Sequence, residues 1–295
     1  MIAMRSTRVE RFPELSYANA ADSRLKQWLI RRVERYSGRD HFAELYDTWR
    51  SRVVGHSERV MGDMLALINI GLSVRAQAWP PEQLPDTPLV IIANHPFGIG
   101  DGIAVLALAE QIDRPFRVLI NKELLKVPEI RPYSLPIDFT ETREAVEMNL
   151  QTRKEAVRLL REGVTIVVFP AGGVATAPKG LGKAQDLPWK AFPARLIQAA
   201  GASVIPVFFE GQNGTLFQLA SKLSLTMRLS LLIREFRRLA GKTITAHVGP
   251  LIPASDLADM RDRKVLTDYL HQAVFSMRPA RRRNDEQRAD ARLAA

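Results

Sequence analysis

The sequence predicts an α/β fold, in which a largely parallel sheet is flanked by helices and preceded by an N-terminal helical segment. Apolar runs rich in Val, Ile, Leu and Phe alternate along the chain with helical stretches. These runs are continuous, without polar residues at every second position, which is typical of strands buried on both faces. The expected strands cover residues 89–94, 116–121, 165–170, 203–210 and 243–249, and helices are expected between them near 101–111, 142–161 and 191–200.

The region before these runs is predicted to be helical from about residue 22 to residue 75. Leu25, Leu29, Val33 and Tyr36 recur at helical spacing, and arginines fill much of the remaining helix surface. This basic amphipathic face suits either the solvated outside of a helical cap or contact with a membrane.

A second amphipathic stretch lies at residues 221–242. Its arginines fall largely outside an apolar stripe, which consists of Leu225, Leu229, Leu232, Phe236 and Leu239. The pattern suits an interfacial helix and equally a helix packed on the sheet.

Changes in composition divide the chain into three parts. A proline-rich connector, WPPEQLPDTP at 79–88, stops any helix before the first apolar run. We therefore expect an N-terminal helical segment at 1–78, a main domain at 79–277 whose last helix covers 263–277, and a basic disordered tail at 278–295.

Composition and charge limit the possible functions. Lys and Arg number 42 against 32 Asp and Glu, which gives a formal net charge of +10. An anionic partner is therefore expected, whether nucleic acid, an anionic bilayer or a phosphorylated substrate, but no nucleic-acid recognition motif accompanies the charge. The absence of cysteine excludes disulfides, thiolate zinc sites and a cysteine nucleophile. The five histidines show no paired metal-ligand spacing, so no metal is expected.

The sequence contains no apolar run long enough to cross a membrane. The longest nearly uncharged apolar window, MLALINIGLSV, covers only residues 64–74, whereas a spanning helix needs about 20 apolar residues. The first residues, MIAMRSTRVERFPELSY, carry charges where a signal peptide would have its apolar core, so no secretion signal is expected. If the protein meets a membrane, we expect it to lie on the surface.

The stretch IIANHPFGIGDGIAVLAL is an apolar strand that runs into Asn94 and His95, and then into glycines and Asp101. Open α/β sheets bind ligands at the carboxyl ends of their strands. Glycine permits positive φ and close backbone approach, so the loop can bring His95 and Asp101 together; the glycines are Gly98, Gly100 and Gly102. A neutral imidazole can remove a hydroxyl proton when a carboxylate fixes its tautomer and stabilises the imidazolium. The alternative is a structural histidine followed by an aspartate that caps the next helix.

The segment NHPFGIGD resembles the first motif of the glycerolipid acyltransferases, the lysophosphatidic acid acyltransferase superfamily. That motif is Asn-His, four residues and an Asp, whereas five residues separate His95 from Asp101. The longer spacing resembles a branch of hemolysin-like and lysophospholipid acyltransferases that read NHP-F/T-G-x-x-D-G. The resemblance implies that His95 is the general base, that Asp101 orients it, and that Asn94 fixes the loop.

Three further stretches resemble the other blocks of this family in the same order. INKELLKVPEI and LPIDFTETREA resemble the second block, which makes Lys122 and Arg143 candidate anion contacts; the alternative for Arg143 is an exposed charge in the first turn of a helix. FPAGGVAT resembles the third block, usually Phe-Pro-Glu-Gly-Thr, but has Ala171 in place of the Glu. The N–H groups of Gly172 and Gly173 either face a phosphate or an oxyanion or form a plain tight turn. VIPVFFEGQ matches the fourth block.

The resemblance covers about residues 89–212 and implies that the domain at 79–277 is an O-acyltransferase. Such an enzyme would transfer a fatty acyl chain from an acyl-CoA or acyl carrier protein thioester to a hydroxyl of a lysophospholipid, without a cofactor or a metal. Its expected partners are the acyl donor, the lysolipid and an anionic membrane surface, with no nucleic acid, and its expected location is peripheral on the cytoplasmic face.

Three alternatives stay open, and one of them, nucleic-acid binding, rests on the net charge and the arginine-rich tail alone. Ala171 suggests an acceptor without phosphate, such as an amino-acid-containing lysolipid. A decayed site would instead leave a non-catalytic membrane adaptor that binds lipid.

Overall fold

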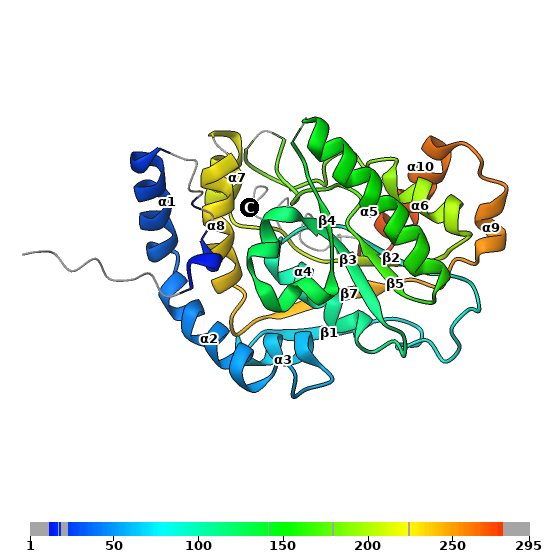
Figure 1. The fold of residues 1–295 in the computed structure, drawn as a ribbon, viewed down its shortest axis with the longest axis horizontal. Helices are drawn as coiled ribbons and strands as arrows, with labels where there is room; N and C mark the ends of the chain where they lie inside the picture. The colour runs from blue at the N-terminus through cyan, green and yellow to red at the C-terminus, as the bar shows by residue number, and fades with distance from the viewer. Residues whose placement is uncertain are drawn as a thin grey trace, which may run out of the picture.

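The computed structural model describes residues 12–16, 18, 23–140, 142–178, 180–223 and 225–279. Within this part of the chain, seven strands form one sheet in the order β1-β7-β6-β2-β5-β3-β4 (Figure 1). The strands are β1 (Gly71–Arg75), β2 (Leu89–Ala93), β3 (Phe116–Asn121), β4 (Ser134–Ile137), β5 (Thr165–Val168), β6 (Ser203–Phe209) and β7 (Thr243–Val248).

Helices precede and connect these strands in the described residues. The α-helices are α1 (Arg24–Tyr36), α2 (Arg39–Arg52), α3 (Val60–Leu67), α4 (Ile99–Ala109), α5 (Arg143–Arg161), α6 (Phe192–Ala200), α7 (Thr215–Leu223), α8 (Leu225–Arg237), α9 (Ala254–Ala258) and α10 (Arg263–Phe275). Short 3-10 helices are η1 (Pro13–Leu15), η2 (Lys122–Lys126) and η3 (Pro128–Tyr133).

The sheet is largely parallel, as the sequence predicts. β2 is parallel to both of its neighbours, β5 and β6, and the parallel arrangement continues through β3 to β4. β7 is antiparallel to β6, and β1 pairs with β7 in a parallel register. The predicted α/β fold is therefore confirmed, and the predicted strands and connecting helices agree with the structure to within two residues at each end.

Both faces of the sheet are covered by helices, which explains the continuous apolar runs. Along β2, Ile91 faces a core shared with α3, α4 and α8, whereas Val90 and Ile92 face a second core shared with α5, α6 and α10. All three side chains are fully buried. Since neither face of β2 meets solvent, the sequence after the end of this strand is the first place where the strand can present polar groups to a ligand.

The N-terminal segment differs from its prediction in two respects. Residues 71–75, predicted to be helical, form strand β1 beside β7. The predicted apolar stripe of α1 also lies mostly outside, because Leu25, Leu29 and Tyr36 are exposed and α1 instead packs through Ile30 and Val33. The reason is that α1 rests against α8 and not against the sheet (Figure 1).

The second amphipathic stretch forms two helices, α7 and α8, separated near residue 224. Leu232, Phe236 and Leu239 are buried, so the described part of the stripe packs inward. This outcome favours the sheet-packed helix over the interfacial one. The side chains of Leu225 and Leu229 lie outside the described set.

The boundaries at residues 78 and 277 remain predictions, and the predicted tail from 278 lies outside the described residues after 279. Across the described ranges, no helix combines the length and the apolar character that a bilayer crossing needs.

Candidate active site

The structure brings His95 and Asp101 together at the carboxyl end of β2. His95 lies in the loop that follows the strand, and Asp101 lies in the first turn of α4. The His95 Nδ1 atom is 3.2 Å from Asp101 Oδ1, and the side chain of Asp101 is fully buried while that of His95 is 16% exposed. The structure therefore places a carboxylate behind the imidazole and leaves part of the ring accessible.

The ring of His95 is not aligned for a hydrogen bond with Asp101. Although Nδ1 and Oδ1 are within hydrogen-bonding distance, both are buried without a hydrogen-bond partner among the described residues. Catalytic hydrogen bonds often tighten only when substrate is bound, so the present alignment is compatible with a bond from Nδ1 to the carboxylate in the complex. The second ring nitrogen, Nε2, lies on the opposite side of the imidazole from Nδ1.

Asp101 also shapes the loop that carries His95. Its second oxygen, Oδ2, accepts a hydrogen bond of 2.9 Å from the Phe97 N–H. The chain reverses at Gly98, whose φ of +86° is strained for any other residue, and a Cβ there would lie 2.9 Å from Leu232 and 3.0 Å from Val174. Of the three loop glycines, Gly98 alone uses the positive φ that glycine permits, since Gly100 and Gly102 lie in α4.

The third residue of the motif, Asn94, joins β2 to β6. Its amide nitrogen donates to the Phe209 carbonyl at 3.0 Å, and its Oδ1 accepts from the Phe209 N–H at 2.7 Å. Asn94 is only 5% exposed, so water has little access to these groups. The side chain continues the pairing of the two strands beyond the point where β2 ends.

Replacing Asn94 by alanine should lower the free energy of unfolding by about 2–5 kcal/mol, because two buried backbone groups of Phe209 lose their partners. Urea denaturation measures this loss. Asn149 is a matched control, since its side chain bonds both backbone groups of Asp138 in the same way, at 2.9 and 2.7 Å, but in a half-buried place that water can enter. Equal losses from Asn94→Ala and Asn149→Ala would show that the burial of the Asn94 contact adds nothing.

Asp186, which the sequence analysis did not single out, also holds the His95 loop. Its Oδ1 accepts a hydrogen bond of 3.2 Å from the His95 N–H, and its Oδ2 accepts one of 3.1 Å from the indole of Trp189. Burial raises the pKa of the Asp186 carboxyl, and these two hydrogen bonds oppose that rise. Since the residue is 91 positions from His95 in the sequence, no local pattern could have revealed the contact.

The glycine turn of the third block lies beside His95. The ring of Phe169 lies against the imidazole, tilted by 31° with ring centroids 4.1 Å apart. The His95 carbonyl accepts a hydrogen bond of 2.7 Å from the Ala175 N–H. These contacts bracket Gly172 and Gly173, and Gly172 has a φ of +67°. Ala171, which stands where the family usually has Glu, is 1% exposed. The structure thus brings this turn to the same edge of the sheet as the predicted base.

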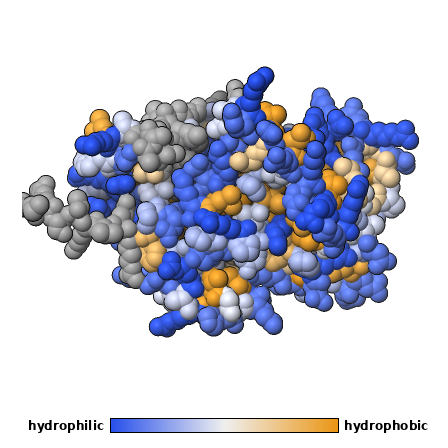
Figure 2. All heavy atoms as spheres, in the orientation of Figure 1, coloured by the Kyte–Doolittle hydropathy of each residue, from blue (hydrophilic) through white to orange (hydrophobic). Residues whose placement is uncertain are grey.

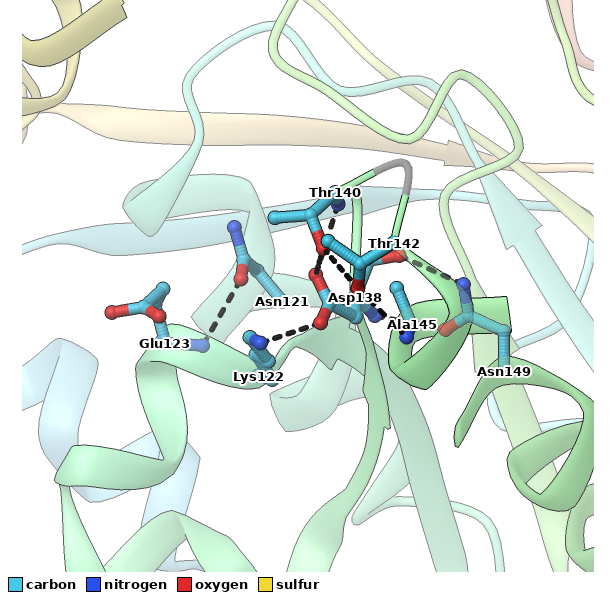
Figure 3. A network of polar contacts seen from close by, with 8 residues as sticks. All are labelled: Asn121, Lys122, Glu123, Asp138, Thr140, Thr142, Ala145 and Asn149. Carbon is cyan, nitrogen blue, oxygen red and sulfur yellow. Dashed lines mark hydrogen bonds and ion pairs between the residues drawn. The ribbon is translucent and has the colours of Figure 1, made fainter. Parts of the chain in front are cut away.

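The structure places Lys122 in a polar network of its own (Figure 3). Lys122 lies just after β3, and its ammonium forms an ion pair with Asp138, which follows β4. The hydrogen bond between them raises the pKa of Lys122 and lowers that of Asp138. Asp138 also accepts hydrogen bonds of 2.9 Å from both the N–H and the hydroxyl of Thr140. The charge of Lys122 is therefore balanced within the protein, and its role as an anion contact stays a prediction.

Arg143 is the first residue of α5 and is exposed to solvent. The helix begins after Thr142, whose hydroxyl accepts a hydrogen bond of 3.2 Å from the Ala145 N–H. This position agrees with the first-turn alternative, and the predicted contact of Arg143 with an anion stays a prediction. In the described part of the chain, no three His, Asp or Glu side chains gather where they could hold a metal ion.

Two surface hollows lie at the other end of the parallel strands. One, of about 370 Å³, is lined by residues 110 and 112–117 before and at the start of β3. The other, of about 380 Å³, includes Gly201 and Ala202, just before β6. Neither contains a predicted site residue, so they are separate from the candidate site.

Comparison with known proteins agrees with these motifs. The Acyltransferase family model matches residues 77–210, which include every predicted site residue. No curated protein matches the chain. The fold is similar to the crystal structure of the 1-acyl-sn-glycerophosphate (LPA) acyltransferase, PlsC, from Thermotoga maritima, with 14% identity and a TM-score of 0.45 over 87% of this chain and 96% of that chain. The family assignment rests on the family model and the four sequence blocks. Residues 77–210 thus match the acyltransferase superfamily that the motifs predicted, which supports acyltransferase activity.

Proposed function

We propose that this protein moves a fatty acyl chain from an acyl-CoA or acyl carrier protein thioester to a hydroxyl of a lysophospholipid, with His95 as general base. The observation that carries this proposal is the 3.2 Å approach of His95 Nδ1 to the buried Asp101 carboxylate, inside the first family block and at the carboxyl end of β2.

The reaction needs a base and a place for negative charge. His95 Nε2 takes the proton of the lysolipid hydroxyl as its oxygen attacks the thioester carbonyl, while Asp101 stabilises the imidazolium at Nδ1. Backbone N–H groups of the Gly172–Gly173 turn would face the oxyanion that forms. When the tetrahedral intermediate collapses, the carbon–sulfur bond breaks and the sulfur takes the proton from the imidazolium. The products are an ester and a free thiol.

The environment of Asp101 supports this role for His95. Because the carboxylate is fully buried, its charge is poorly screened by water and acts strongly on the adjacent ring. Its Oδ2 is held by the Phe97 N–H, so Oδ1 remains for the imidazole. A carboxylate that only shaped the loop would use Oδ2 alone, whereas here Oδ1 also faces the imidazole.

The proposal is tested by acyl transfer with the purified protein. Labelled acyl-CoA and acyl carrier protein donors are each offered with a mixed pool of lysolipids, and the product is identified by mass. A new phospholipid is the expected result. Product from a phosphate-free lysolipid alone would favour the alternative acceptor suggested by Ala171, and lipid binding without turnover would favour the adaptor.

We also infer that the protein acts at a membrane surface, because its acceptor resides in a bilayer. Support comes from α1, which exposes Leu25 (75%), Trp28 (54%) and Tyr36 (78%) to solvent on a helix rich in arginine. Elsewhere, in the view of Figure 2, hydrophilic side chains cover most of the surface and apolar ones emerge in separate patches. An apolar face beside basic residues is the pattern by which helices bind anionic membranes.

Replacing Leu25 and Trp28 together by serine should weaken binding to anionic vesicles at least about tenfold, since each buried apolar side chain contributes about 1.5–3 kcal/mol. Vesicle sedimentation measures the change. The matched control is Val146→Ser with Leu150→Ser, which removes two exposed apolar side chains from α5. If both double variants bind as well as the unaltered protein, α1 is not the contact.

A further inference from the structure

Arg228 lies beside the glycine turn of the site although it belongs to none of the four family blocks. It is on α8, beyond the residues that the family model matches. Its Nη2 donates a hydrogen bond of 2.7 Å to the Val174 carbonyl, and the same atom is 3.6 Å from where a Cβ on Gly173 would lie. The guanidinium therefore contacts the turn whose backbone N–H groups are candidates to face an anion.

Helix α8 forms one wall of the site. Leu232, one turn after Arg228, packs against the His95 loop, because a Cβ on Gly98 would lie only 2.9 Å from it. Val174, which accepts the hydrogen bond from Arg228, is followed by Ala175, whose N–H donates to the His95 carbonyl at 2.7 Å. Arg228 and His95 are thus bound to adjacent residues of one segment.

No carboxylate in the described part of the chain balances the charge of Arg228. Within the described residues no Asp or Glu forms an ion pair with it; its other contact is with the ring of Phe217, at 5.9 Å. Further along the same helix, Arg234 pairs with Glu235 at 3.2 Å. Arg228 is half-buried, and burial lowers its pKa. A half-buried cation is poorly hydrated, so its attraction to a bound anion is weakened less by water than that of an exposed cation.

We propose that Arg228 binds a phosphate group of a substrate at the Gly172–Gly173 turn. The inference rests on the proposed function and names a recognition residue for it. A guanidinium offers five N–H groups in a fixed fork, of which the Val174 carbonyl takes one, so the others match phosphate oxygens. The third block FPAGGVAT carries no carboxylate that would compete for Arg228, because Ala171 replaces the usual Glu. The phosphate belongs either to the lysolipid head group or to the pantetheine arm of the acyl donor.

Calorimetric binding of two soluble probes tests this site without requiring turnover. Glycerol 3-phosphate represents the acceptor head group, and pantetheine 4′-phosphate represents the donor arm. We expect Arg228→Gln to weaken binding of one probe at least about tenfold, as expected when a charge-assisted hydrogen bond is lost. The affinity of Arg228→Lys should lie between those of the unaltered protein and Arg228→Gln, because lysine keeps the positive charge but lacks the two-pronged guanidinium. The probe affected identifies the source of the phosphate.

The control is Arg234→Gln, which removes a charge of the same helix that already has a partner. Thermal unfolding of each variant checks that the fold is intact.

In kinetic assays, Arg228→Gln should raise the KM for the phosphate-bearing substrate at least about tenfold while kcat changes little. Unchanged binding of both probes by Arg228→Gln, or binding of neither probe by the unaltered protein, overturns the inference. Loss of probe binding in Arg228→Gln, with no acyl transfer by the unaltered protein, would retain the phosphate site and reject the proposed function.

Discussion

Replacing His95 by alanine should lower the rate of acyl transfer at least about 100-fold, which is the lower end of what a lost general base costs. The variant removes the partly exposed imidazole whose Nδ1 lies 3.2 Å from the buried Asp101 carboxylate. Binding of lysolipid should change much less, because the imidazole contributes to proton transfer and not to holding the acyl chain. The measurement is the initial rate of labelled ester formation at saturating donor.

His56→Ala is the matched control for this variant. His56 is exposed, and its ring Nδ1 lies 3.1 Å from the Val54 carbonyl. It should retain the full rate. Equal ester formation by His95→Ala and His56→Ala would remove His95 from the mechanism. The hydrogen bonds that fix the loop involve the backbone N–H and carbonyl of His95 and not its imidazole. His95→Ala should therefore unfold at nearly the temperature of the unaltered protein.

Replacing Asp101 by asparagine should have an effect of similar size, about 100- to 10,000-fold on kcat, although the side chain keeps its shape. The amide oxygen can still accept the hydrogen bond from the Phe97 N–H, so the amide nitrogen then faces His95 Nδ1. An N–H donor at that place makes Nδ1 the acceptor and puts the proton on Nε2. The nitrogen that should take the substrate proton is then already protonated.

Asp101→Asn and Asp101→Ala together separate the two roles of this residue. Asp101→Ala leaves the buried Phe97 N–H without a partner, so it should lower the free energy of unfolding by about 1–3 kcal/mol, whereas Asp101→Asn should not. Both should lose activity. If Asp101→Asn kept a normal rate, the carboxylate would serve only the loop, and the aspartate would be the structural cap that the sequence analysis weighed as the alternative.

The sequence predicted the strands and helices of the main sheet well because each was marked by its own residues. β2, β5 and β6 are buried on both faces, and their uninterrupted apolar runs require no knowledge of neighbours. Strand β1 was missed because its pairing partner, β7, lies about 170 residues away, and its apolar residues continue those of α3 without a break. β4 was missed because it is a short strand that contains Pro136, which is tolerated there at the edge of the sheet.

The candidate site divides in the same way. His95 and Asp101 are close in sequence, so the motif alone was enough to predict the contact that the structure shows. The ion pair of Lys122 with Asp138 and the hydrogen bond of Asp186 with His95 join segments that only the sheet brings together. Arg228 is further removed still in the sequence, because its position beside Gly173 depends on how α8 packs against the loops after β2 and β5. Polar partners of this kind follow from the tertiary structure and have no local signature.

The attachment of the His95 loop to both neighbours of β2 also bears on how the activity of this chain arises. On one side the loop is bound to Ala175, beyond β5, and on the other Asn94 is bound to Phe209, at the end of β6. During synthesis, the histidine emerges from the ribosome more than 100 residues before the second of these anchors. A chain that ends before β6 therefore contains the whole first motif without the contact that anchors Asn94, and we expect it to lack the proposed activity.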